Sequence, residues 1–470
     1  MTAATSPAVG TRREWTSIRV IATSSAALAL TAPGQTAAIS AFVNPLQRGL
    51  HLSSSAVSGA YLIGSLAGAW TMPLLGRATD RWGPRTLMAI IGVVFGAVLM
   101  ALSTVSGVVG LTAGFIGIRM AGQGALNLVA TTTVALYVTR RRGLAQGITA
   151  AVGGAGISLA PVLLEGAVAD HGFRQVWLWE GLIIWATVIP LAVFALPRRR
   201  PRDAAVHGTE SGTHNSRPSS SHAVEADASW TLREAMHTGM FWLVTGGVSV
   251  TGMLGTALAF HQIDILGERG LSPAMAAANF LPQTAAGLLA TLLTGYLADR
   301  VADRALISAA MLVLVVALVA ASYVGPGWGA IGYAIAVGTA GNSIRTLEAT
   351  AFPNCFGLAH IGAIRGVVHT AAVAGTAFGP LAFSLGRDVS SSYRPVLLVS
   401  ALVPAAVAML APFVRPPARK TIAPRPSTET AISHDPIPVM PADLGGYDDW
   451  PDHDEHAADA ACADGASRRD

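Results

Sequence analysis

An arginine and two amides recur at intervals of four residues within one long apolar stretch. Arg119, Gln123 and Asn127 lie in residues 108–137, where Arg119 is the only charged side chain. An ionisable side chain at membrane depth is costly and usually functional, and a helix beginning near residue 108 would place this arginine roughly 16 Å down, near the bilayer midplane. Residues four apart share a helix face, and a guanidinium binds a carboxylate through paired hydrogen bonds. The stripe predicts a site for a small organic anion; the structural alternative is an arginine that holds helices together by bonding backbone carbonyls.

The composition indicates which elements must position this stripe. Hydrophobic residues make up 52% of the 470 positions and charged residues 12%, about half the usual charged share of a soluble domain. The mean hydropathy of +0.50 implies that lipid is the main solvent. A helix needs about 20 mainly apolar residues to cross a bilayer. Twelve segments qualify, with cores near 18–43, 55–76, 86–106, 108–137, 143–166, 175–196, 240–264, 275–297, 304–324, 327–352, 362–386 and 394–415.

One stretch of the sequence occurs twice at a fixed offset. Residues 76–85 return in degenerate form as residues 295–304, 219 positions later (295 − 76), and each copy lies between two apolar segments. The same offset carries several glycines and one proline of the first half onto the second: Gly143, Gly147, Gly156 and Pro161 onto Gly362, Gly366, Gly375 and Pro380. A register held over so many residues indicates two halves of like internal spacing. We expect twelve transmembrane helices in two pseudo-symmetric six-helix bundles, an all-α membrane protein.

The duplication brings residues of the second half toward the anion site. The offset maps Gln123 onto Asn342, and two amides related in this way fit a site between the halves. Arg345 lies three residues further on and either assists Arg119 or pairs with Glu348. His261 ends the seventh segment, where it would contact substrate, relay protons or serve as a packing histidine.

The repeated stretch resembles the signature loop of the major facilitator superfamily. It reads Gly-x-x-x-Asp-Arg-x-Gly-x-Arg between the second and third segments, and its copy lies between the eighth and ninth. The resemblance covers the whole membrane body and implies that these residues control the conformation, by latching one side of the protein while the other is open. Asp80 and Asp299 would meet helix N-termini, and the arginines would pair with acids or cap helix C-termini; the alternative is that they only anchor the topology. The set is Gly76, Asp80, Arg81, Arg85, Gly295, Asp299, Arg300 and Arg304.

A second repeated feature places a proline within a membrane helix of each half. Gly156 and Pro161 in the fifth segment correspond to Gly375 and Pro380 in the eleventh, and a helix can bend where proline removes a backbone hydrogen bond. A fuller version of the first pattern is typical of drug/proton antiporters in the superfamily. Ala160 and Glu165 depart from that version, which weakens a drug-exporter interpretation.

Three short segments resemble a narrower branch, the oxalate/formate antiporters and monocarboxylate porters. They are residues 32–36, residues 260–262 and residues 352–366. The branch implies a small organic anion, moved with protons or by exchange, and the superfamily resemblance puts Gln35 on the cavity wall. A proton-coupled exporter of drugs or hydrophobic compounds, and a receptor or sensor with a transporter fold, remain the alternatives.

Arginines crowd one set of loops, and the positive-inside rule then places both termini in the cytoplasm. The expected parts are a tail (1–15), a first bundle (16–200), a linker (201–237) with a short surface helix near Trp230–His237, a second bundle (238–416) and a disordered tail (417–470). The arginine-rich, nearly lysine-free composition indicates a bacterial plasma membrane. We expect a monomer that is not an enzyme, uses no metal or other cofactor, and binds its solute and the bilayer but no nucleic acid.

Overall fold

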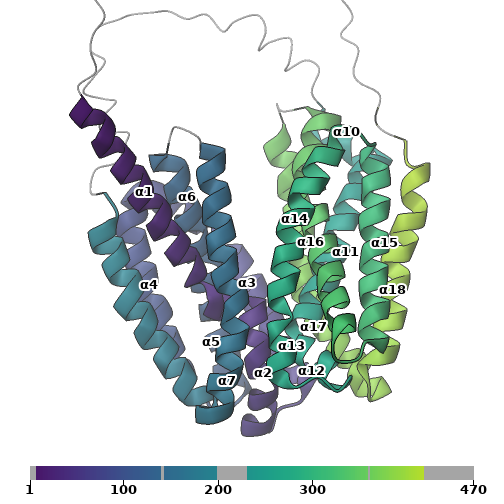
Figure 1. The fold of residues 1–470 in the computed structure, drawn as a ribbon, viewed down its shortest axis with the longest axis horizontal. Helices are drawn as coiled ribbons and strands as arrows, with labels where there is room; N and C mark the ends of the chain where they lie inside the picture. The colour runs from purple at the N-terminus through teal and green to yellow at the C-terminus, as the bar shows by residue number, and fades with distance from the viewer. Residues whose placement is uncertain (1–6, 139–141, 198–229, 358–359, 416, 418–470) are drawn as a thin grey trace, which may run out of the picture. The chain divides into compact units, whose positions relative to one another are not determined.

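The protein is helical throughout the residues that its computed structural model describes, which are 7–138, 142–197, 230–357, 360–415 and 417. The predicted linker core and terminal tail lie outside this range. Figure 1 shows the helices of the first half in purple to blue and those of the second half in green to yellow. Twelve spans account for the described helices, as the duplication predicts.

The first half forms six spans, and their bounds show where helices break. The first span consists of α1 (Pro7–Ala29), a 3-10 turn η1 (Ala32–Gly34) and α2 (Thr36–Leu50), and the second and third are α3 (Ser54–Trp82) and α4 (Pro84–Leu102). The fourth consists of α5 (Val108–Ile118), the π-helical η2 (Arg119–Leu126) and α6 (Asn127–Tyr137). The fifth and sixth both lie in α7 (Arg142–Pro190), which ends in the π-helical η3 (Leu191–Ala195). α7 turns at Gly172, where φ is 79°, so this one element contains the fifth and sixth spans.

The second half also forms six spans. Its elements are the short α10 (Leu232–Met236), α11 (Gly239–Phe260), α12 (Gln262–Gly267), α13 (Pro273–Ala278), α14 (Phe280–Ala298), α15 (Asp303–Tyr323), α16 (Trp328–Phe356), α17 (Ile361–Ser390), α18 (Tyr393–Leu410) and the 3-10 turn η4 (Ala411–Phe413). α10 is the predicted surface helix; its capping box joins Thr231 and Glu234, and Trp230 packs edge-on against Phe356 at the end of α16.

The segments that differ most from expectation are those with helix breakers. Among the described residues, seven helices are long and apolar enough to cross a membrane by that criterion alone, the α7 pair counted as one. The first span, which Pro33 and Gly34 divide, and the fourth, whose π-helical middle contains Arg119 and Gln123, are not among these seven. α16 carries Arg345 and Glu348 within its length. The breaks in the first and fourth spans lie side by side, with η1 packed against η2.

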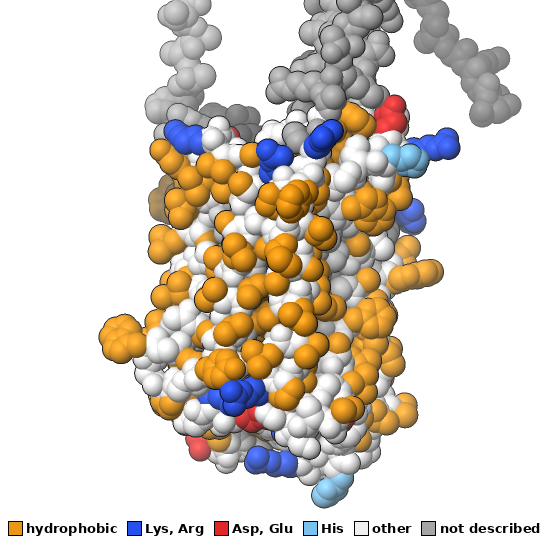
Figure 2. All heavy atoms as spheres, turned by 90° about the vertical axis from the view of Figure 1, so that its right-hand side faces the viewer, with side chains coloured by type: hydrophobic (Ala, Val, Ile, Leu, Met, Phe, Trp, Pro, Cys, Tyr) orange, Lys and Arg blue, Asp and Glu red, His pale blue; other side chains and the backbone are white. Residues whose placement is uncertain are grey.

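Lipid-facing side chains distinguish the middle of the helices from their ends. Figure 2 shows hydrophobic side chains over the middle of one face, with charged side chains near its two ends. Large apolar residues of α15 and α18 such as Val316 and Leu402 are exposed. Exposed apolar surface of this extent is stable only in a bilayer.

Arginines cap the last helix of each half at a symmetric position. Arg85 donates from Nη2 to the carbonyl oxygen of Val193 at 2.6 Å, and Arg304 donates from Nη1 to the carbonyl oxygens of Pro412 at 3.3 Å and Val414 at 3.4 Å. The 219-residue offset relates Arg85 to Arg304 and Val193 to Pro412. The last carbonyls of a helix lack intrahelical partners, so these two signature arginines perform the predicted C-terminal capping.

Candidate functional site

Arg119 lies at the centre of the first half, where the broken first and fourth spans meet. It begins the π-helical stretch η2 and is only 5% exposed. π-helical turns within α-helices are frequent at functional sites. Gly34 and Gly122 make the close approach possible, because a Cβ on Gly34 would overlap the carbonyl oxygen of Ile118 and come within 3.0 Å of the Gly122 Cα.

The guanidinium of Arg119 is held on one edge and one face. Its Nη1 donates to the Gly34 carbonyl oxygen at 3.2 Å and to Thr36 Oγ1 at 3.4 Å. Its Cζ lies 4.7 Å from the centre of the Tyr61 ring, a cation–π contact. The Tyr61 hydroxyl and Thr36 Oγ1 are 2.7 Å apart, so the two side chains that hold the arginine also hold each other.

The other edge of the guanidinium has no partner within the described part of the chain. The buried Nε makes no hydrogen bond, and neither ion pair found among the described residues involves Arg119. A buried donor without an acceptor is costly, and a buried charge needs compensation. The Nε–Nη2 edge is the one that binds a carboxylate side-on through two parallel hydrogen bonds.

The predicted amides of the first half lie in or next to the elements that surround Arg119. Gln123 is half-buried in η2, and its Oε1 is a buried acceptor with no hydrogen bond. Asn127 is half-buried at the start of α6. Gln35 follows η1 directly and donates to Thr31 Oγ1 at 3.0 Å. The π-helical geometry changes the strict i, i+4 face that the sequence predicts, because a π turn contains more residues than an α turn.

The residues predicted from the second half take different positions. Asn342 donates to the Gly338 carbonyl oxygen at 3.1 Å, and its amide lies against Gly287 of α14. Arg345 is exposed. Glu348 forms its ion pair with Arg365, at 4.0 Å; the described structure therefore does not show the alternative pairing of Glu348 with Arg345.

His261 lies in a buried network between the halves. Its Nε2 is 3.0 Å from the Pro380 carbonyl oxygen and 3.2 Å from Ser384 Oγ, and its Nδ1 is 2.9 Å from the Tyr393 hydroxyl. A neutral ring that donates from Nε2 and accepts at Nδ1 satisfies these partners. We call His261, Ser384 and Tyr393, with Ser54 and Ser58 of the first half, the far-end network, because they lie at the end opposite the signature loops.

The far-end network joins α3 to α17. Ser384 Oγ is 2.6 Å from Ser58 Oγ and 3.2 Å from Ser54 Oγ. Within the described residues the other hydrogen bonds between the halves are Asn44 to Asp264 and Ser158 to Thr284. All of these hydrogen bonds between the halves lie between the middle of the helices and the far end.

Asp264 is a residue that the sequence interpretation missed. It lies beyond the end of the α11 span, in α12, and accepts a hydrogen bond from Asn44 of α2. Burial raises the pKa of its carboxyl, against the opposing effect of the Asn44 hydrogen bond. Nearby, Glu268 pairs with Arg387 at 3.5 Å. A six-residue helix such as α12 is too short to give a periodic signal, so only the three-dimensional contact reveals this acid.

The conformational role predicted for the signature residues stays a prediction. Asp299 is exposed, and Arg300 donates to the Tyr296 carbonyl oxygen at 2.9 Å. Gly295 is not crowded in this conformation, since an added Cβ would reach only Thr346 Cγ2 at 4.0 Å. Gly76 and Asp80 lie in α3 and Arg81 near its end.

The residues predicted to bend helices lie in helices that pack closely. α7 continues through Pro161 and α17 through Pro380. A Cβ on Gly156 would come within 2.5 Å of the Ala29 Cβ, and one on Gly375 within 2.7 Å of the Ser249 carbonyl oxygen. Close approach of the fifth span to the first, and of the eleventh to the seventh, is therefore one purpose of these glycines; bending in transport stays a prediction.

Twelve spans in two related halves, with a buried arginine where two broken helices meet, are the arrangement expected of a membrane transporter. A family model described as Major Facilitator Superfamily matches residues 24–380. The chain belongs to this superfamily.

The relatives found by sequence are transporters whose names state different solutes. The chain is 35% identical over 160 residues to a triacylglyceride transporter of Mycolicibacterium hassiacum, which covers 33% of this chain and 26% of that protein. It is 28% identical over 151 residues to an oxalate:formate antiporter of Oxalobacter formigenes, covering 32% and 36%. The chain thus aligns with about a quarter to a third of the length of these two relatives.

Two solved transporters resemble it over most of their length. An inward-facing, occupied bacterial homologue of the human lysosomal transporter Spinster has a TM-score of 0.61 at 16% identity, covering 86% of this chain and 97% of that one. The nucleoside transporter NupG has a TM-score of 0.66 at 12% identity, covering 85% and 98%. At these identities the likeness shows the fold alone.

Proposed function

We propose that the protein is a secondary active transporter that moves a small organic anion, such as a monocarboxylate, across a bacterial plasma membrane. The observation that carries this proposal is the buried Arg119, whose Nε edge has no protein partner in the described residues. A carboxylate on that edge would neutralise the buried charge and satisfy the donor. The similarity to an oxalate:formate antiporter supports the same class of solute.

The hydrogen bonds between the halves support a direction of opening. They run from the middle of the helices to the far end, which the arginine distribution assigns to the outside of the cell. In this proposal the conformation is open toward the cytoplasm, and the signature residues latch that side in the opposite conformation. Transport then alternates between these two conformations, driven by protons or by exchange of one anion for another.

Proteoliposomes test the proposed solute directly. We expect labelled formate or oxalate to enter vesicles containing the protein, faster when the vesicles are preloaded with unlabelled anion or carry an inward proton gradient. Formamide, which lacks a carboxylate, should not compete with the anions, and uridine should neither enter nor compete. Uptake of uridine with no uptake of either anion would contradict the anion assignment.

A hydrophobic solute is the second candidate, favoured by a groove of about 710 Å³ along α14 and α16. Its lining is apolar and includes Pro282, Leu289, Leu293 and Ile335. The triacylglyceride transporter among the relatives fits such a solute. Efflux of a lipophilic dye from the same vesicles, with no anion uptake, would favour this candidate.

A further inference from the structure

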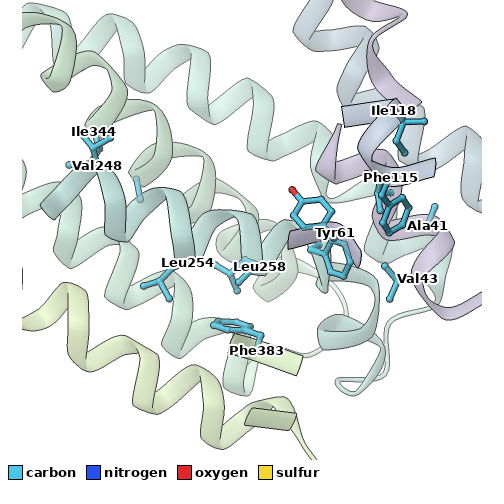
Figure 3. Close-up of a cluster of buried hydrophobic side chains, with 14 of the residues drawn as sticks. Ala41, Val43, Tyr61, Phe115, Ile118, Val248, Leu254, Leu258, Ile344 and Phe383 are labelled. Atoms are coloured by element: carbon cyan, nitrogen blue, oxygen red, sulfur yellow. The ribbon is translucent and has the colours of Figure 1, made fainter. Parts of the chain in front are cut away.

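Tyr61 contacts the candidate anion site and the opposite half of the protein at once. Its ring lies beneath the guanidinium of Arg119, 4.7 Å away. The same ring meets Phe260 of α11 edge-on, with 4.7 Å between centroids. Figure 3 shows Tyr61 between labelled side chains of the first half, such as Phe115, and labelled side chains of the second half, such as Leu258 and Phe383.

The residues next to this pair form the far-end network. Ser58 lies one helical turn before Tyr61 on α3, and His261 follows Phe260 directly. Ser58 and His261 both bond Ser384. Tyr61 and Phe260 are 0% and 1% exposed. An apolar contact and a polar contact thus lie side by side between the same two halves, and both must break when the far end opens.

We infer that Tyr61 is the positioning residue through which occupancy of Arg119 controls opening of the far end. This inference rests on the proposed anion site. With the site empty, the bare guanidinium attracts the ring and holds it in the position from which it also packs on Phe260. A bound carboxylate neutralises the guanidinium, weakens the cation–π attraction, and leaves the ring less firmly held against the other half. Far-end opening then requires less free energy when the anion is bound.

Phe260→Leu is the decisive variant, because it removes the ring contact between the halves without touching Arg119. Its matched control is Phe241→Leu on the same helix, since Phe241 is equally buried and its ring contacts are Trp242 and Phe352 of its own half. Phe260→Tyr keeps the ring and is expected to keep the coupling. The readout is the distance between spin labels at His51→Cys and Asp388→Cys, two exposed positions at the far ends of α2 and α17, in a chain with Cys355→Ala and Cys462→Ser.

Oxalate is the probe, and its affinity is measured separately by calorimetry on the same detergent-solubilised samples. In the background chain and in Phe241→Leu, oxalate should lengthen the label distance. In Phe260→Leu the open population without oxalate should rise about two- to tenfold, as expected for loss of one aromatic pair. The further increase caused by oxalate should be lost, while oxalate affinity should stay within about threefold of the control.

Each outcome separates the coupling from the proposed function. Oxalate binding with an unchanged distance response in Phe260→Leu would overturn the role of Tyr61 and leave the anion site standing. Absence of oxalate and formate binding in the background chain would overturn the anion site and this coupling together. If Phe260→Leu does not purify as a folded protein, Phe260→Met gives the same comparison, because it keeps the apolar volume and removes the ring.

Discussion

Arg119→Lys should lower the apparent affinity for the transported anion by roughly 10- to 100-fold, as expected when one hydrogen bond to a charged group is lost. Lysine keeps the positive charge but lacks the planar pair of donors that grips a carboxylate side-on. It also cannot satisfy the Gly34 carbonyl, Thr36 and a ligand in the geometry that the guanidinium achieves. Arg119→Ala should abolish uptake. Initial rates of formate or oxalate uptake across a concentration series measure both effects.

The control for this prediction is Arg19→Lys. Arg19 is an exposed arginine of α1 whose Nη2 donates to the carbonyl oxygens of Phe194 and Ala195 at 3.0 and 3.2 Å, away from η1 and η2. Its uptake kinetics should match the unmodified protein. Wild-type affinity in a folded Arg119→Lys protein would instead support the alternative in which Arg119 only bonds backbone carbonyls.

Gly338→Ala should destabilise the second half by about 1–3 kcal/mol, the usual cost of overpacking, and reduce the yield of folded protein. A Cβ at this position would overlap the Gln283 carbonyl oxygen and lie 2.8 Å from its carbonyl carbon. These are backbone atoms of α14, so α14 and α16 would have to separate along their contact. Small residues at such helix crossings provide the close packing that stabilises membrane helix pairs.

Gly341→Ala is the matched control, one turn further along α16. Nothing lies within 4 Å of a Cβ there, so the substitution should be neutral or slightly stabilising because alanine favours helix. Thermal unfolding of both variants in the same detergent measures the difference. Equal melting temperatures would show that α14 and α16 can yield at this crossing at little cost.

The duplication explains how much of the architecture could be predicted. The apolar segments and the repeated Gly-Asp-Arg stretch predict twelve spans in two halves, and the family match confirms the superfamily. Arginine capping of helix ends was one of two roles predicted for the signature arginines, and Arg85 and Arg304 show it. These features repeat in the sequence, so they can be predicted before the structure is known.

The breaks in the first and fourth spans were not predicted, although the sequence contains glycine or proline residues at both positions. Pro33 and Gly34 interrupt the first span, and Gly122 and Gly124 lie in the π-helical stretch after Arg119. Breakers of this kind are common inside membrane helices and need not end them. Which of them interrupts the helix depends on the neighbouring backbone, here the contact of Gly34 with Ile118 and Gly122.

The partners of Arg119 show the limit of sequence reasoning most clearly. Thr36 and Tyr61 contact Arg119, and Phe260 packs on Tyr61. The three residues belong to three different elements, and Tyr61 lies outside the segments that resemble the oxalate/formate branch. Nothing in their spacing links them to an arginine in the fourth span. Contacts between distant segments depend on packing, and a single sequence contains no periodic signal for them.

The arginine caps have a consequence for how the chain can be divided. Each half ends in a helix whose last carbonyls are bonded by an arginine of that same half, Arg85 in one and Arg304 in the other. These carbonyls are therefore bonded from within the same half. Two separately encoded polypeptides, divided between positions 201 and 229, should then associate in one membrane into a functional transporter. Covalent linkage of the two halves would then not be required for their assembly.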